Sequence, residues 1–221
     1  MIPIHDSQRS LNTPWVTTLL IAANVFVFLY QVSLDPFTRN DFTFQYGFVP
    51  ARFSFDSLLT SMFLHGGWMH LIGNMLFLWV FGDNVEDILG HGRFLLFYLL
   101  CGVAAALLQF AVNPASRVPM VGASGAIFGV MGAYALKFPH ARISMIGWFI
   151  FLFTFEAPAW VVMLYYLGVN LFSGFGAIAD VMNERGGVAF FAHVGGFLAG
   201  ALLIRLLPVR PRGRLRYESA W

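Results

Sequence analysis

Val121-Gly-Ala-Ser-Gly-Ala-Ile-Phe-Gly-Val-Met-Gly132 is the stretch that decides the fold of this chain. It places one hydroxyl, that of Ser124, at the head of a glycine-striped apolar segment that runs to Lys137. If Ala126 to Lys137 is helical, Ser124 lies about 20 Å from that lysine, well short of a hydrocarbon core of about 30 Å. The serine then starts its helix below a membrane surface, where a loop and a hydroxyl are tolerated only around a wet cavity that the protein shields. We therefore expect a short central helix that begins at such a cavity.

Composition places the whole chain in a membrane. Hydrophobic residues make up 58% and charged residues 11%, whereas a soluble domain carries about 25% charged residues. The mean hydropathy is +0.72. We expect one polytopic membrane domain at residues 15–207, between an N-terminal segment, residues 1–14, and a basic tail, residues 208–221, with no separate soluble domain. The N-terminal segment lacks a short apolar core with a small-residue cleavage site, so we expect no removable signal peptide.

The apolar segments predict an all-α, six-transmembrane helical bundle with a short central fourth helix. In order, the spans are Trp15 to Leu34, Gly67 to Gly82, Phe94 to Val112, the short segment that ends at Lys137, a fifth from near Pro158, and Val188 to Leu207. Pro36 is expected to end the first span. The first loop, Asp35 to Gly67, holds an apolar piece from Phe55 to Leu64 that is too short to cross and is expected at the interface. We also expect Ile143 to Phe155 to lie along the interface, because Pro158 suits the first turn of the next helix.

Lysine and arginine counts predict the orientation. With six spans both termini share one side, which receives 9 of these residues, and the other side receives 4. The positive-inside rule then places both termini in the cytoplasm, and we expect a bacterial cytoplasmic membrane. The tail arginines directly follow a span, so we interpret them as anchors to the headgroups of the lipid bilayer and expect no nucleic acid partner.

Polar residues from distant segments fall at one depth. His70, Ser124 and His193 each lie 12 or 13 positions before the charged residue that ends their segment. Each is therefore roughly 18 to 20 Å above the cytoplasmic boundary. Asn74, one turn further along the second span, shares the face of His70.

Glycine stripes predict how these residues meet. Small residues four apart let helices approach closely. Two such pairs are Gly125 with Gly129 and Gly196 with Gly200. His193 lies three positions before Gly196, so it shares that stripe. If the two stripes pack together, His193 is brought against Ser124.

Each polar residue also has a simpler interpretation. Ser124 alone is typical of a packing serine bonded to its own backbone. His70 and Asn74 are compatible with an interhelical hydrogen-bond pair. His193 is harder to explain in this way, because an ionisable residue at membrane depth is costly and usually functional.

Serine hydrolysis is the chemistry that needs this set of groups. A serine hydroxyl is a poor nucleophile until a base takes its proton, and the imidazole of His193 suits that task near neutral pH. The tetrahedral intermediate needs preorganised donors, for which the candidates are the Asn74 amide, the His70 imidazole and the Ser124 backbone N–H. Asp180 and Glu184, the carboxylates nearest in sequence to His193, fall in an outer loop. We therefore expect a dyad.

In these residues the sequence resembles the rhomboid intramembrane serine proteases, and the resemblance covers nearly the whole six-span core. The motifs are Gly122-x-Ser124-Gly125-x-x-x-Gly129, Ala192-His193-x-x-Gly196-x-x-x-Gly200, His70-x-x-x-Asn74 preceded by His65-Gly-Gly, and Gly82-x-x-x-Glu86-x-x-x-Gly90.

The resemblance implies roles for these residues. Ser124 is the nucleophile, His193 its base, His70 and Asn74 the oxyanion hole, and Glu86 a structural brace. It also implies that the partners are transmembrane protein substrates, cut near the outer interface after entry beside the fifth span, with no cofactor or metal. One departure is visible: the Trp-Arg pair common in the first loop of many members is replaced here by Pro50-Ala-Arg52-Phe53.

Other functions fit less well. Metal hydrolysis lacks a His-Glu-x-x-His motif, and an aspartyl mechanism lacks aspartates inside the spans. Cys101 is the single cysteine, so a cysteine-based metal site is excluded. A membrane transporter is the main rival, because polar groups at half depth also describe substrate pathways, but the halves show no internal repeat. A catalytically inactive rhomboid-like binding protein is the other alternative, against which stand the intact Ser124 and His193.

Overall fold

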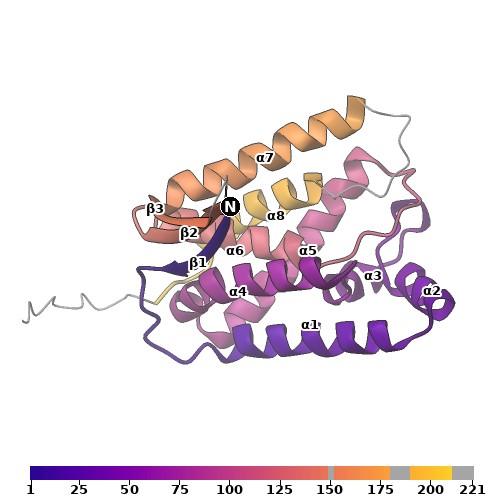
Figure 1. Ribbon diagram of the computed structural model, residues 1–221, viewed down its shortest axis with the longest axis horizontal. Coiled ribbons are helices and arrows are strands. Elements are labelled where there is room, and N and C mark those ends of the chain that lie inside the picture. The colour runs from indigo at the N-terminus through magenta and orange to yellow at the C-terminus, as the bar shows by residue number, and fades with distance from the viewer. Residues whose placement is uncertain (149–151, 180–189, 211–221) are drawn as a thin grey trace, which may run out of the picture.

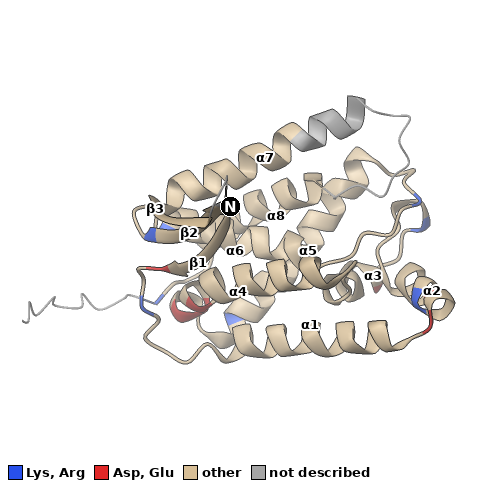
Figure 2. Ribbon diagram, viewed as in Figure 1, with Lys and Arg blue, Asp and Glu red and all other residues tan. Residues whose placement is uncertain are grey.

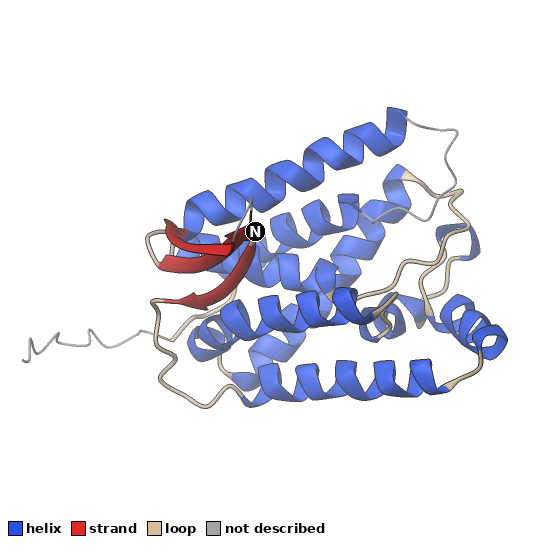
Figure 3. Cartoon of the chain, in the orientation of Figure 1, coloured by secondary structure: helices blue, strands red, loops and turns tan. Residues whose placement is uncertain are grey.

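The computed structural model describes residues 1–148, 152–179 and 190–210, and it is mostly helical (Figures 1 and 3). The long helices are α1 (Trp15–Ser33), α4 (Trp68–Leu89), α5 (His91–Val112), α6 (Ser124–Lys137), α7 (Ala159–Ala179) and α8 (Phe190–Leu206). By length and composition, two helices of the described chain can cross a membrane, α1 and α5. The apolar part of α7, Ala159–Phe172, and α8 are shorter apolar helices. Charged residues gather toward the two ends of the bundle (Figure 2).

α6 is the central helix of the bundle, in contact with α4, α5, α7 and α8. Every residue from Gly125 to Tyr134 is buried. A helix that is apolar on all sides has no face to offer to water and is stable only inside a ring of other helices. Its 14 residues span about 21 Å, so Ser124 and Lys137 lie at different depths in the molecule.

α4 is longer than the predicted second span. It continues past Gly82 to Leu89, and Glu86 and Asp87 are buried within its last turns. The predicted end of this span at Gly82 was wrong because these acids have partners on other segments, which the local sequence does not reveal. Gly90, with φ +77°, ends α4 and allows α5 to start at once.

The expected all-α fold requires a correction, since the described chain contains a three-stranded antiparallel sheet (Figure 3). Its strands are β1 (Ile2–Asp6), β2 (Arg142–Trp148) and β3 (Leu152–Pro158), in the order β1-β2-β3. Ile143, Met145 and Gly147 on β2 are buried, and Ser144 and Ile146 between them are not. This alternation is typical of a half-buried strand. Within the segment expected along the interface, β2 pairs antiparallel with β3 and, on its other edge, with β1 of the N-terminal segment.

The first loop also contains a helix that the sequence reading missed, α2 (Pro36–Tyr46). Asp35 caps it by accepting hydrogen bonds from the backbone N–H groups of Phe37 and Thr38, and Pro36 occupies the first turn. Hydrogen bonds from Thr38 hold the pKa of Asp35 below its usual value. Pro36 therefore begins a helix as well as following one. The apolar piece Phe55 to Leu64 forms only the short turns α3 (Ser57–Thr60) and η2 (Ser61–Phe63), after η1 (Pro50–Arg52).

Candidate active site

Ser124 is the first residue of α6, and the loop before it is held in place by backbone hydrogen bonds. Gly122 has φ +121°, a conformation that favours glycine, and its N–H donates to the Ser61 carbonyl at 2.9 Å. Met120 and Phe48 exchange two backbone hydrogen bonds, of 2.8 and 3.0 Å. The first loop is thus bound directly to the loop that carries the serine, through Phe48 rather than through a Trp-Arg pair.

His193 of α8 lies against the serine. Its Nε2 is 2.8 Å from the Ser124 Oγ, and the imidazole is buried. The ring stacks on Phe128, with centroids 4.4 Å apart and an angle of 5° between the planes. Phe128 lies one turn after Ser124 on the same face of α6, so one helix supplies both the hydroxyl and the surface that holds the ring flat.

The glycine stripes allow this contact. A Cβ added at Gly196 would collide with the Gly125 carbonyl, and one added at Gly200 would collide with the Gly129 carbonyl. The backbones of α6 and α8 therefore touch along two turns, at a separation that only glycine permits. Because His193 precedes Gly196 by less than one turn, this close approach brings its ring to the start of α6.

His70 and Asn74 of α4 face the other side of the Gly122 loop. A Cβ at Gly122 would lie 2.8 Å from the His70 Nε2 and 3.4 Å from the Asn74 Nδ2. Asn74 is buried, and its Nδ2 has no hydrogen-bond partner among the described residues. His70 is exposed, and its Nδ1 accepts from the Gly66 N–H at 3.3 Å. The Asn74 amide thus presents, beside the Gly122 loop, a donor that no described residue satisfies.

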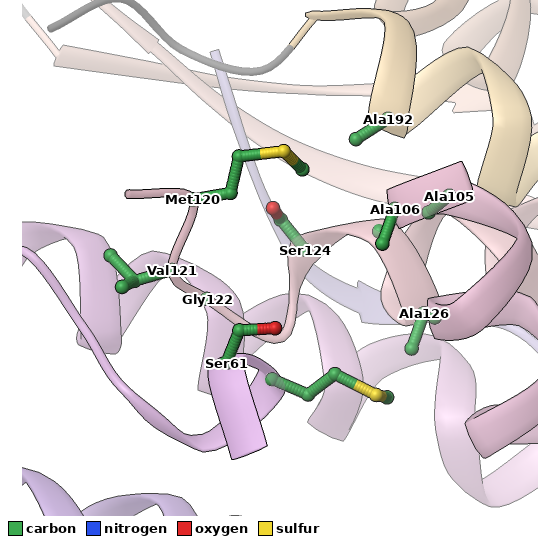
Figure 4. Close-up of a pocket in the computed structure, with 12 residues that line it drawn as sticks. Ser61, Ala105, Ala106, Met120, Val121, Gly122, Ser124, Ala126 and Ala192 are labelled. Carbon is green, nitrogen blue, oxygen red and sulfur yellow. The ribbon is translucent and has the colours of Figure 1, made fainter. Parts of the chain in front are cut away.

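A small cavity opens at the serine (Figure 4). Its volume of about 40 Å³ holds at least one water molecule. The lining residues, from four parts of the chain, are Ser61, Met62, Gly102, Ala105, Ala106, Met120, Val121, Gly122, Ser124, Gly125, Ala126 and Ala192. In Figure 4 the Ser124 hydroxyl lies among Met120, the Gly122 loop and Ala192 of the facing helix. The nucleophile candidate is therefore reachable by water although its helix is buried.

The chain also matches a known protein family. The family model of the Rhomboid domain matches residues 52–210. The chain belongs to the rhomboid family. The resemblance noted from the sequence motifs is thereby confirmed, and rhomboids are integral membrane proteins.

Three relatives illustrate the similarity. Rhomboid protein 1, mitochondrial, of Saccharomyces cerevisiae is 32% identical over 173 residues, 75% of this chain and 46% of the relative. Presenilin-associated rhomboid-like protein, mitochondrial, of Homo sapiens is 34% identical over 163 residues, 70% of this chain and 39% of the relative. Rhomboid protease GluP of Bacillus subtilis is 36% identical over 143 residues, 65% of this chain and 24% of the relative. The chain thus spans less than half the length of these relatives.

Glu86, the brace expected from the rhomboid resemblance, lies far along α4 from the catalytic candidates. Its carboxylate accepts from the Val16 N–H at 2.9 Å, and from the Thr17 N–H and hydroxyl at 2.7 Å each. It also contacts His91 Nδ1 at 2.5 Å. A carboxylate at a helix N-terminus satisfies free N–H groups and complements the helix dipole. Glu86 therefore joins the start of α1 to the end of α4.

The contact of Asn170 of α7 with the catalytic candidates of this rhomboid was not predicted from the sequence. Its Oδ1 lies 2.5 Å from the His193 Nδ1. Asn170 is an amide and not a carboxylate, and its signal in the sequence is a polar side chain inside the apolar run of the fifth span. The stacking of Phe128 on His193 was also not predicted, because a phenylalanine in an apolar helix does not stand out from its neighbours in the sequence.

Among the residues that the structure describes, no three His, Cys, Asp or Glu side chains cluster so as to hold a metal ion. The residues gathered around Ser124 offer a hydroxyl, imidazoles and amides, and this set suits acyl transfer.

Proposed function

We propose that this rhomboid is an intramembrane serine endopeptidase that cleaves transmembrane segments of other membrane proteins near the outer interface. The observation that carries the proposal is the 2.8 Å contact of the Ser124 Oγ with the His193 Nε2, beside a donor on Asn74 that has no partner among the described residues. A nucleophile, a base in hydrogen-bond reach and unused donors are the parts that peptide hydrolysis requires.

The first half of the reaction forms an acyl-enzyme. His193 takes the proton of Ser124 as the hydroxyl attacks the scissile carbonyl, and the resulting imidazolium then protonates the leaving amine. In the second half, His193 removes a proton from a water molecule, which hydrolyses the ester on Ser124. The cavity at the serine supports this step, because it admits water to a buried helix end.

The oxyanion is stabilised by donors on two elements. The backbone N–H of Ser124 is free for this role, because the first N–H groups of a helix have no intrahelical partner. Asn74 contributes its Nδ2 from α4. His70 contributes Nε2–H, since its Nδ1 accepts from Gly66 and the neutral ring then carries its proton on the other nitrogen.

The remaining glycines and Glu86 hold these groups in place. Gly122 gives the loop its conformation, and Gly125, Gly129, Gly196 and Gly200 set the distance between α6 and α8. Glu86 acts as a brace between α1 and α4, away from the reacting atoms.

The membrane arrangement we propose has six spans, formed by α1, α4, α5, α6, α7 and α8. The apolar α1 and α5 support it directly, and the charges at the two ends of the bundle agree with it. Both termini are cytoplasmic, supported by the distribution of lysine and arginine, and substrates enter beside α7. The relatives include mitochondrial proteins and one from Bacillus subtilis, so a bacterial cytoplasmic membrane stays a prediction.

The test is reconstitution of the purified protein in liposomes with a single-span substrate. We expect the wild type to cleave it, and Ser124→Ala and His193→Ala each to lower the rate by at least about 10⁴-fold. A fluorophosphonate probe is expected to label the wild type and not Ser124→Ala. Ser33→Ala, which removes an exposed hydroxyl at the end of α1, is the control that retains both signals.

Two results would contradict the proposal. Cleavage retained in both Ser124→Ala and His193→Ala would remove the catalytic roles. A wild type that binds the single-span protein but neither cleaves it nor reacts with the probe would make the chain an inactive member of the family.

A further inference from the structure

Asn170 lies on the side of His193 that faces away from Ser124. Its Oδ1 is 2.5 Å from the His193 Nδ1, and both side chains are buried. The imidazole is therefore held at both nitrogens, by α7 on one side and by the head of α6 on the other.

The orientation of the Asn170 amide is set by its own helix. Its Nδ2 donates to the Tyr166 carbonyl at 2.8 Å, which turns the amide oxygen toward the imidazole. An amide oxygen can only accept a hydrogen bond, so the His193 Nδ1 must carry a proton. The neutral ring then has its lone pair on Nε2, the nitrogen that lies 2.8 Å from the Ser124 hydroxyl.

We propose that Asn170 is a positioning residue, which holds His193 in the tautomer and ring orientation that a base for Ser124 requires. The role rests on the proposed protease function. When His193 takes the serine proton, the imidazolium donates from Nδ1 to the Asn170 oxygen, and no proton passes to the amide. The acceptor is neutral, which suits its place, because a carboxylate at membrane depth carries a large desolvation cost.

The position of Asn170 also links the base to α7. Phe128 stacks on one face of the imidazole and restricts its tilt, but a stacked ring can still turn in its plane and exchange tautomers. The hydrogen bond that the His193 Nδ1–H donates to Asn170 of α7 removes that freedom. The reactivity of Ser124 consequently depends on the place of α7 relative to α8.

Two variants of similar size separate positioning from packing. Asn170→Leu keeps the volume and removes the acceptor, and Asn170→Asp keeps an acceptor oxygen. We expect Asn170→Leu to lower kcat by about 10- to 100-fold with KM unchanged, because a lost hydrogen bond to a developing charge has an effect of that order. Asn170→Asp is expected to recover most of the rate. Leu202→Ala, at an exposed position of α8, is the control and should behave like the wild type.

The tautomer can be measured without turnover. With ¹⁵N-labelled histidine, His193 is assigned by the signal lost in His193→Ala, and its nitrogen shifts report which nitrogen carries the proton. We expect the Nδ1–H form in the wild type and in Asn170→Asp, and a mixture in Asn170→Leu.

The outcomes distinguish this inference from the proposed function. Wild-type kcat in Asn170→Leu, or an unchanged tautomer in it, would overturn the role of Asn170 while the effect of Ser124→Ala still supported the protease. Equal losses in the Leu and Asp variants would also overturn it, since packing alone would then explain both. An inert wild type would remove the protease and this role with it.

Discussion

α4 carries two polar clusters that differ in how their hydrogen bonds are satisfied. At its C-terminal end, the buried Glu86 meets three donors on α1 and a histidine at the start of α5. Toward its N-terminal end, the buried Asn74 has an Nδ2 with no partner among the described residues. A satisfied buried group stabilises a fold, and an unsatisfied one costs free energy unless a ligand meets it. The difference indicates that the C-terminal end of α4 stabilises the fold, whereas the N-terminal end is arranged to bind a ligand.

The largest effect is expected where the satisfied cluster is broken. Glu86→Ala should lower the free energy of unfolding by about 3 to 5 kcal/mol, because donors on Val16 and Thr17 lose their acceptor and each unmet donor costs about 1 to 3 kcal/mol. Thermal unfolding in detergent measures this. Glu156→Ala removes a carboxylate from an exposed ion pair at the same end and is the control, with an expected cost below about 1 kcal/mol. Equal effects of the two variants would contradict the role of Glu86 as a brace.

The next effect tests the unsatisfied cluster. Asn74→Ala should slow substrate cleavage by about 10² to 10³-fold, the usual loss on removal of one oxyanion donor. Its Tm should stay near that of the wild type, because the Nδ2 makes no hydrogen bond that folding would lose. Full turnover in this variant, measured with the reconstituted substrate, would remove Asn74 from the oxyanion hole.

A third prediction concerns pH at the same end of α4. Burial, with a smaller contribution from the nearby His70, lowers the pKa of His65 from its usual 6.5 to about 4. Between these values the unfolded chain binds a proton that the folded protein does not, so stability should fall as pH drops from 6.5 toward 4, by up to about 3 kcal/mol. His65→Phe should flatten this dependence in thermal unfolding scans. An unchanged slope would assign the acid sensitivity to another group.

The smallest effect probes the contact between α6 and α8. Gly200→Ala should cost about 1 to 3 kcal/mol, because its Cβ would overlap the Gly129 carbonyl and force the two backbones apart. Gly73→Ala on α4, where an added Cβ meets nothing within 4 Å, should be neutral or slightly stabilising in the same unfolding measurement. If both variants behaved alike, close packing would not be what sets the distance between α6 and α8.

The sequence predicted the features that follow from local rules. A depth count along apolar segments and a period of small residues were enough to propose that His193 meets Ser124, and the structure has these atoms 2.8 Å apart. The depth count uses positions within one helix, and the period of small residues describes the contact between two glycine stripes. The roles of these residues remain predictions until activity is measured.

The features that the sequence did not reveal depend on partners from distant segments. The predicted end of α4 was too early because Glu86 is buried by contacts with α1 and Asp87 by a contact with Asn12, and an acid alone signals a loop. Asn170 was missed because its role is defined by the nitrogen of His193 that it faces. The sheet was missed because β1 pairs with β2, and no local signal near Ile2 names a partner at Ile146.

The pairing of β1 with β2 also sets an order of assembly. β1 leaves the ribosome before α1, but Ile2 cannot pair until Ile146 has been synthesised. Synthesis at about 5 to 20 residues per second separates these two residues by several seconds or more. Asp6, which follows on β1, accepts hydrogen bonds from Asn84 of α4 and from the Tyr134 hydroxyl of α6. The first strand to be synthesised is thus among the last to pack. When it does, Asp6 contacts Tyr134 near the C-terminal end of α6, the helix that begins at Ser124.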